Sequence, residues 1–307
     1  MNEPYRIDNI EFNAEGVLLR GWMYQPTEAT HSVPAIVMAH GYNCLKELYL
    51  DKYAEVFVKQ GFAVLVFDNR NFGDSGGEPR QELDPWQQVK DYRHAITFMQ
   101  TQAFVDPDRI GIWGTSYSGG HVLVVAALDK RVKCVVSQVP TISGWEGTLR
   151  RTQPGDLDAL RKEFNQDRMN RFNGLPPKMI PMIADPSKKG MASHTSLDAW
   201  DFFTGKHALV EDQWRFKKWR NEITLRSVEM YSEYEPGLYI ARIAPTPLLM
   251  LVAENDAVAV TDKALEAFNS AREIKKLHLF AGGHFSAYID QFNPLSEEAV
   301  QWFEKHL

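Results

Sequence analysis

The sequence has only two cysteines, Cys44 and Cys134, among its 307 residues. Two are too few for the disulfide framework of a small secreted domain or for a cysteine-based zinc site. Basic residues are not in excess either, since 34 Lys and Arg against 40 Asp and Glu leave a net charge of −6. This balance provides no electrostatic attraction for nucleic acid or an anionic membrane surface, so we expect neither as a partner.

Long apolar runs and cofactor motifs are also missing. No stretch approaches the ~18 consecutive apolar residues that span a bilayer, and the acidic start of the chain does not resemble a signal peptide. The chain contains no His-Glu-x-x-His zinc motif, no P-loop and no Gly-x-Gly-x-x-Gly nucleotide fingerprint. We therefore expect a cytoplasmic protein that uses no metal or other cofactor, and the sequence leaves open whether it forms a homo-oligomer.

What the sequence does contain is a regular alternation of strand-like and helix-like segments. Residues 5–12 and 17–25 alternate between apolar and polar positions, which is typical of an antiparallel hairpin with one solvated face. Six nearly continuous apolar runs predict strands of a buried parallel sheet: Pro34–Ala39, Phe62–Phe67, Ile110–Trp113, Val132–Val136, Pro247–Val252 and Leu277–Phe280. Amphipathic segments at 46–60, 82–101, 119–129, 262–274 and 294–306 predict helices. The order indicates an α/β fold with a mostly parallel central sheet flanked by helices.

One long segment interrupts this alternation. It shows no parallel-strand signal over about 100 residues, whereas a βα connection usually has about 2–6. We predict a core domain made of 1–142 and 241–307 and a mainly helical cap inserted at 143–240, with helices near 155–172 and 195–204. The insert carries four of the eight tryptophans and five of the ten methionines. These residues are consistent with an apolar lid that faces the substrate, and equally with a small core within the insert itself.

The strongest chemical signal is the run Gly-Thr-Ser-Tyr-Ser-Gly-Gly from Gly114 to Gly120. It lies between a predicted strand and a predicted helix, which is the context of a nucleophile elbow. In that turn the Ser116 hydroxyl is lifted clear of the sheet at the helix N-terminus, where backbone N–H groups favour negative charge. Taken alone, the run also fits a Gly/Ser-rich loop or an anion-binding turn.

Two further residues complete a candidate catalytic set with Ser116. A serine hydroxyl needs an imidazole to accept its proton, and the imidazole needs a carboxylate to fix its tautomer. Asp256 and His284 each follow a predicted strand, so both are expected at the carboxyl edge of the sheet that carries Ser116. Glu254 is the alternative acid. Activity should then rise as the pH passes the ordinary pKa of histidine, about 6.5.

With these residues in place, the chain resembles the α/β-hydrolase superfamily of serine hydrolases over its whole length apart from the insert. It is similar to dienelactone-hydrolase-like and X-Pro dipeptidyl-peptidase (cocaine-esterase)-like proteins, whose elbow often reads Gly-x-Ser-Tyr-x-Gly, and to fungal polyketide transferases. Ser118 departs from the commoner Gly-x-Ser-x-Gly pattern. The resemblance implies an oxyanion hole formed by the N–H groups of Tyr42 and Tyr117, with the Tyr42 hydroxyl as an alternative donor.

These features predict a serine hydrolase that cleaves a carboxylic ester or thioester through an acyl-enzyme on Ser116. The substrate is expected to be a small molecule with a medium-sized, partly apolar acyl group or leaving group, and the near-neutral insert does not indicate a strongly charged one. Three alternatives use the same fold: an acyltransferase similar to polyketide transferases, a cofactor-free carbon–carbon bond hydrolase and a ligand receptor without activity.

Other polar residues are predicted to have structural roles. We expect His40 to shape the oxyanion loop, and Asp68 and Arg70 to brace the loop that follows the second parallel strand. His94, His121, His278 and His306 fall within predicted helices or strands, and His207 is expected to be exposed in the insert, although it could contact substrate.

Overall fold

The computed structural model describes residues 4–153, 155–185, 187, 190–206 and 208–307. Across these residues an eight-stranded sheet has the spatial order β1-β2-β4-β3-β5-β6-β9-β10. The strands are β1 (Tyr5–Ala14), β2 (Val17–Pro26), β3 (Val33–Ala39), β4 (Ala63–Phe67), β5 (Val105–Thr115), β6 (Val132–Gln138), β9 (Leu248–Ala253) and β10 (Lys275–Phe280). Strand β2 pairs antiparallel with β1 and β4, and all the other pairs are parallel. The predicted mostly parallel sheet is therefore confirmed.

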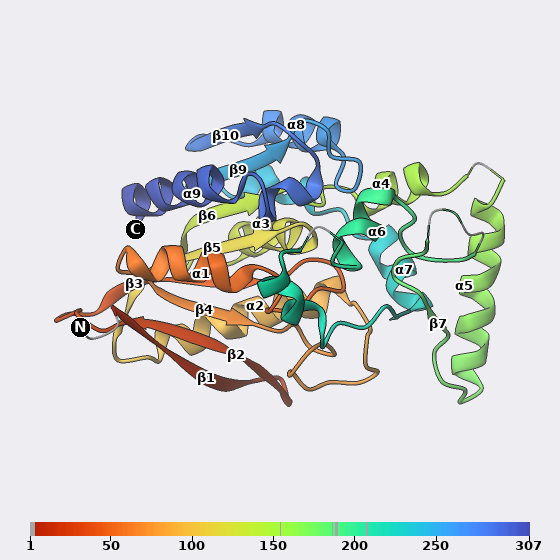
Figure 1. Ribbon diagram of the computed structural model, residues 1–307, viewed down its shortest axis with the longest axis horizontal. Helices are drawn as coiled ribbons and strands as arrows, with labels where there is room; N and C mark the ends of the chain where they lie inside the picture. The colour runs from red at the N-terminus through yellow and green to blue at the C-terminus, as the bar shows by residue number, and fades with distance from the viewer. Residues whose placement is uncertain (1–3, 154, 186, 188–189, 207) are drawn as a thin grey trace.

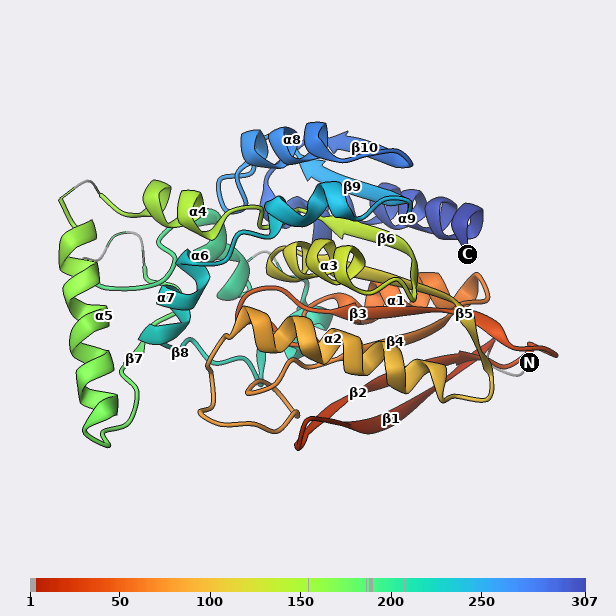
Figure 2. The same ribbon diagram turned by 180° about the vertical axis from the view of Figure 1, so that it is seen from behind.

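Helices cover both faces of the sheet (Figures 1 and 2). Helices α1 (Leu50–Lys59) and α9 (Phe292–His306) lie on one face, and α2 (Pro85–Gln100), α3 (Tyr117–Leu128) and α8 (Thr261–Ser270) lie on the other. Helix α2 begins where Asp84 accepts hydrogen bonds from the N–H groups of Trp86 and Gln87, with Pro85 in the first turn. In the described ranges, no helix has both the length and the apolar character needed to cross a membrane.

Three predicted helices are shorter than expected, and the helix predicted at 82–101 spans only Pro85–Gln100. The helix predicted at 46–60 begins at Leu50, because Lys46 is held in an irregular turn by hydrogen bonds from both its N–H and its ammonium group to Asp68. The helix predicted at 262–274 ends at Ser270, where Ala271 takes an extended conformation. Most strands follow their apolar runs closely, but β5 spans Val105–Thr115 where only Ile110–Trp113 was predicted; β4 and β9 are buried along their whole length.

Most of the segment between β6 and β9 lies at one end of the molecule, whereas its last residues pack against α3 and α8 of the core (Figures 1 and 2). It contains α4 (Gly144–Arg151), α5 (Leu157–Phe172), β7 (Met179–Ile180), α6 (Leu197–Phe203), η1 (Val210–Phe216), β8 (Ile223–Thr224), α7 (Leu225–Ser232) and η2 (Pro236–Arg242). Helices α5 and α6 match the two helices predicted there. Phe202 of α6 stacks on Phe285 of the core with ring centres 4.3 Å apart. The division into a core (1–142 and 241–307) and a cap (143–240) stays a proposal.

Helix α3 carries a buried histidine with a consequence for stability. The ring nitrogens of His121 lie 2.9 Å from Gln88 Oε1 and 3.0 Å from the Tyr234 hydroxyl. Burial lowers the pKa of His121 to about 3. Since the ordinary histidine pKa is about 6.5, the unfolded chain binds one more proton than the native protein between these values. The stabilisation from neutral His121 is therefore complete above pH ~6.5 and is lost as the pH falls.

We expect the free energy of unfolding to fall with acidification by ~1.4 kcal/mol per pH unit from His121 alone. Urea unfolding between pH 6 and pH 4, a range that lies between the two pKa values, measures this slope. His121→Gln should flatten it by that amount, whereas His31→Gln, at an exposed position, should leave it unchanged. An unaltered slope in His121→Gln would contradict the assignment.

Candidate active site

Ser116 lies in a sharp turn between β5 and α3. Its backbone has φ 58° and ψ −118°, a conformation that costs energy for any residue other than glycine. The turn is fixed because the Ser116 carbonyl accepts hydrogen bonds from the N–H groups of Gly120 and Thr141, at 3.2 and 2.9 Å. A side chain at Gly114 could not fit, since its Cβ would lie 2.2 Å from the Ser118 carbonyl oxygen. The strand–turn–helix geometry is that of a nucleophile elbow.

The serine at position 118 does not loosen this turn. Its hydroxyl is buried and lies 2.9 Å from the Tyr92 hydroxyl, on the side of α3 that packs against α2. The close approach occurs at the next residue instead. A Cβ at Gly119 would lie 2.8 Å from the Gln138 carbonyl oxygen of β6. The departure from the Gly-x-Ser-x-Gly pattern is therefore accommodated by a one-residue shift of the tight contact.

The structure brings Ser116, His284 and Asp256 together at the carboxyl edge of the sheet, after β5, β10 and β9. His284 Nε2 lies 3.0 Å from Ser116 Oγ, and His284 Nδ1 lies 2.7 Å from Asp256 Oδ2. Asp256 Oδ1 accepts the N–H groups of Val258 and Ala259 at 2.8 and 2.7 Å. These hydrogen bonds fix the carboxylate, while only 2% of His284 is exposed. The arrangement can transfer the hydroxyl proton to the imidazole.

Glu254, the alternative acid, lies on the other side of this loop. Its side chain is exposed, and its N–H donates to the Phe280 carbonyl across the pair of strands β9 and β10. In an extended chain, residues two positions apart point to the same side, because successive side chains alternate. The chain turns after Ala253, and for this reason the carboxylate of Asp256 is buried while that of Glu254 is solvated. Of the two acids, the structure places Asp256 on the histidine.

Two backbone N–H groups flank the Ser116 hydroxyl. The loop after β3 packs so closely on the elbow that a Cβ at Gly41 would lie 2.9 Å from Ser116 Cβ. Within the described residues, neither the Tyr42 N–H nor the Tyr117 N–H donates a hydrogen bond to another backbone or side-chain group. The Tyr42 hydroxyl, by contrast, accepts a hydrogen bond from Ser193 Oγ of the cap at 3.2 Å. This arrangement favours the main chain of Tyr42 as an oxyanion donor.

We therefore expect Tyr42→Phe to keep kcat within about tenfold of the wild-type value, since losing a true oxyanion donor costs ~10²–10³. Steady-state hydrolysis of a p-nitrophenyl ester measures this. Ser193→Ala is the matched control, because it removes the same hydrogen bond from the other side. A loss of ~10² or more in Tyr42→Phe alone would assign the oxyanion contact to the hydroxyl.

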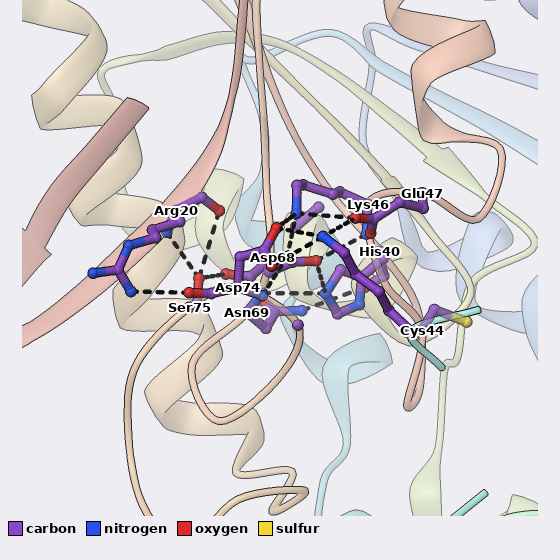
Figure 3. A network of polar contacts seen from close by, with 12 residues as sticks. Arg20, His40, Cys44, Lys46, Glu47, Asp68, Asn69, Asp74 and Ser75 are labelled. Atoms are coloured by element: carbon purple, nitrogen blue, oxygen red, sulfur yellow. Dashed lines mark hydrogen bonds and ion pairs between the residues drawn. The ribbon is translucent and has the colours of Figure 1, made fainter. Parts of the chain in front are cut away.

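A buried polar network holds the loop after β3 in place (Figure 3). His40 Nδ1 donates to the Gly41 carbonyl at 3.1 Å, and His40 Nε2 accepts the Asn69 N–H at 3.1 Å. Burial lowers the pKa of His40, which keeps the ring neutral for this pattern. Asp68 accepts the N–H and the ammonium of Lys46 at 2.9 and 2.7 Å. His40 and Asp68 thus have the structural roles predicted for them.

Arg70 ties the neighbouring loop to α2. Its guanidinium binds the buried Asp91 through two hydrogen bonds, at 2.8 and 2.5 Å. This contact confirms that Arg70 is structural. His94, His278 and His306 lie on α2, β10 and α9 as predicted, whereas His207 is outside the described residues.

Two residues of the cap also contact this polar network. Lys218 Nζ lies 3.0 Å from Asp74 and 3.1 Å from Glu47, both of which also contact Lys46. Trp219 Nε1 donates to the Asn43 carbonyl at 2.9 Å. Cap residues therefore contact the loop that supplies the Tyr42 N–H.

A narrow cavity of about 40 Å³ lies over Ser116, and residues of the segment 143–240 form part of its wall. Its apolar lining includes Leu48, Leu50, Met182, Ala199, Phe202, Phe203, Val258 and Phe285. Of the insert's tryptophans and methionines, only Met182 is among the described residues that line it, so the insert presents an apolar surface to the cavity while its tryptophans lie elsewhere. Phenylalanines of α6 form that surface instead. A wider recess of about 770 Å³ borders the other side of His284.

Two polar cap residues in this cavity were not singled out by the sequence. Arg151 and His194 both line it, together with Ser116 and His284. They are 43 positions apart in an irregular insert, so no spacing pattern connects them. Among the described residues no group of three His, Cys, Asp or Glu side chains is arranged to hold a metal ion.

The comparisons with known proteins agree with this geometry. A family model described as X-Pro dipeptidyl-peptidase (S15 family) matches residues 15–286. The chain belongs to the X-Pro dipeptidyl-peptidase (S15) family. The predicted α/β-hydrolase fold and the prediction of a hydrolase are thereby confirmed.

Several known proteins are similar to this S15-family chain. A quorum-quenching protein, AidA of Acinetobacter baumannii (strain MDR-ZJ06), is 34% identical over 291 residues, covering 94% of this chain and 91% of that protein. A thiohydrolase of Eupenicillium brefeldianum is 32% identical over 300 residues, covering 97% and 93%. The solved structure of DcsB in complex with its substrate analogue has a TM-score of 0.85 and 26% identity, over 98% of this chain and all of that one.

Proposed function

We propose that this protein is a serine hydrolase that cleaves a carboxylic ester or thioester, with Ser116 as nucleophile, His284 as general base and Asp256 as the orienting acid. The observation that carries the proposal is the continuous hydrogen-bonded chain from Ser116 Oγ through His284 to Asp256, at 3.0 and 2.7 Å. The similarity to a thiohydrolase supports the thioester as a substrate class.

In the proposed reaction, Ser116 Oγ attacks the acyl carbonyl while His284 Nε2 accepts its proton. The N–H groups of Tyr42 and Tyr117 hold the oxyanion of the tetrahedral intermediate. His284 then protonates the leaving alcohol or thiol, and the acyl group stays on Ser116. In the second half, His284 takes a proton from water, which attacks the acyl-enzyme; the bond to Ser116 Oγ breaks, His284 returns the proton to Oγ, and a carboxylic acid is released.

The substrate is proposed to carry a partly apolar acyl group, because phenylalanine and aliphatic side chains form most of the cavity wall. A screen of p-nitrophenyl esters of increasing chain length, acyl thioesters and aminoacyl amides tests this, with Ser116→Ala as the blank. Failure of every ester and thioester to give Ser116-dependent release of acid would refute the proposal.

An acyltransferase would share each step up to the acyl-enzyme and differ only in the group that removes the acyl chain. Product analysis with and without an added alcohol or amine separates the two, since a hydrolase gives the acid in both cases. A carbon–carbon bond hydrolase would instead cleave a diketone and leave simple esters intact. Cytoplasmic location and assembly state stay predictions, which cell fractionation and gel filtration address.

A further inference from the structure

The cavity over Ser116 contains one cationic side chain without an acidic partner. Arg151, the last residue of α4, lines the cavity, and no Asp or Glu is present among the described residues around it. Among the described residues the guanidinium makes one hydrogen bond, from Nη1 to His194 Nε2 at 2.5 Å. A guanidinium has five N–H donors and is charged at any physiological pH, so the partly exposed Arg151 keeps donors without a protein partner that a ligand can bind.

The guanidinium is also held in one orientation. Its central carbon lies 4.6 Å from the centre of the Tyr231 ring, and Tyr231 is 4% exposed. Together with His194, the ring fixes the plane of the guanidinium before a ligand arrives. A fixed plane lowers the entropy lost when a planar, bidentate acceptor binds.

His194 adds a second unmatched donor. Because its Nε2 accepts the Arg151 N–H, its proton must be on Nδ1, and burial beside Arg151 lowers the pKa of His194 so that the ring stays neutral. Only 6% of His194 is exposed, yet Nδ1 has no hydrogen-bond partner among the described residues. A buried donor without an acceptor is costly, and a ligand oxygen in the cavity would relieve that cost.

The adjoining recess carries acidic side chains. Asp198, Asp201 and Asp290 line this wider space beside His284, and Asp201 is paired with the Lys206 ammonium at 2.9 and 3.1 Å. An anionic group of a substrate is therefore attracted to the narrow cavity and repelled from the recess. The two spaces share Phe202, His284 and Phe285, so one substrate could extend from one to the other past the reacting serine.

From these observations we propose that Arg151, supported by His194, binds a carboxylate group of the substrate. The protein then acts on esters or thioesters that carry a second, ionised carboxyl group, and Arg151 determines this specificity. The inference rests on the proposed hydrolase function, because it names the class of substrate that the Ser116 site accepts.

The chain offers a matched control at the preceding residue. Arg150 lies on the same helix, but its guanidinium binds Asp262 outside the cavity, at 2.9 and 2.7 Å, and does not line the site. Arg150→Gln and Arg151→Gln therefore remove the same charge from the same helix, and only the second removes it from the cavity.

The test compares p-nitrophenyl hexanoate with the p-nitrophenyl monoester of adipic acid, which has the same chain length and a terminal carboxylate. Arg151→Gln is expected to lower kcat/KM for the adipate monoester by about 10–100-fold and to change that for the hexanoate by less than about threefold. Arg150→Gln should change neither by more than about threefold. Retained hexanoate hydrolysis also shows that Arg151→Gln is folded.

A third substrate, 4-carboxyphenyl hexanoate, places the carboxylate on the leaving group. A loss in Arg151→Gln confined to this ester would support carboxylate recognition on the leaving-group side. An equal loss on all three substrates, or no loss on either carboxylate ester, would overturn the inference. Absence of Ser116-dependent hydrolysis of the neutral hexanoate by the wild-type protein would instead count against the proposed function itself.

Discussion

Ser116→Ala is expected to lower kcat for ester hydrolysis by about 10⁵–10⁶-fold, because without Oγ no acyl-enzyme can form and only the oxyanion donors and substrate binding remain. The fold should be unaffected, since the elbow is held by main-chain hydrogen bonds of Ser116 that alanine retains. Steady-state kinetics on the best p-nitrophenyl ester give the ratio. Intact-protein mass spectrometry after a fluorophosphonate probe should show one label in the wild type and none in the variant.

Ser118→Ala is the control within the same turn. Its hydroxyl faces Tyr92 and not the cavity, so kcat should fall by less than about tenfold. A Ser116→Ala protein that keeps its activity and its label would remove the basis of the proposed mechanism. A wild-type protein that takes up no label at all would favour a ligand receptor that has kept the pocket without the reaction.

Asp256→Asn should lower kcat by about 10⁴-fold, with little change in KM, because an amide at this position favours the wrong tautomer of His284 and cannot stabilise the imidazolium. The two N–H groups of Val258 and Ala259 that now bind Asp256 Oδ1 can still bind the amide oxygen. The loop should therefore keep its shape. Thermal unfolding of the variant, recorded beside the kinetics, separates a local effect from loss of structure.

Glu254→Gln provides the matched comparison two residues away. The Glu254 side chain is exposed, and the same change of carboxylate to amide there should leave kcat within about twofold. The assignment would be contradicted if Glu254→Gln lowered kcat strongly and Asp256→Asn did not. If Glu254→Gln were the inactive variant, the acid of the site would have to be reassigned and the loop would have to rearrange during catalysis.

Much of the fold could be predicted from the sequence because its signals are local. The buried runs of β4 and β9, the cap of α2 at Asp84 and the glycines around Ser116 each report on their immediate neighbours. The misplaced start of α1 has a different origin. Residues 46–49 have helical composition, but the Lys46 ammonium binds the buried carboxylate of Asp68 and the exposed carboxylate of Asp74, which lie far away in the sequence.

The candidate site divides in the same way. Ser116, His284 and the carboxyl-edge loops follow from the order of strands, whereas the choice between Asp256 and Glu254 depends on one turn whose direction no periodicity reveals. Arg151 and His194 could not be found, because the near-neutral charge of the insert as a whole does not show which of its cationic side chains faces the cavity. The tryptophan content of the insert did not predict the cavity wall for a related reason: composition does not tell which residues of a lid face the cavity.

The contacts between the cap and the loop after β3 limit how freely this lid can be exchanged. Lys218 and Trp219 bind Asp74 and the Asn43 main chain, next to the residue proposed to hold the oxyanion. A chimaera that receives the lid of another family member would therefore bring foreign anchors to the catalytic loop. A chimaera could acquire the substrate preference of a relative only if both sides of these contacts match. Either the transferred segment keeps Lys218 and Trp219, or the loop residues that they bind are exchanged together with it.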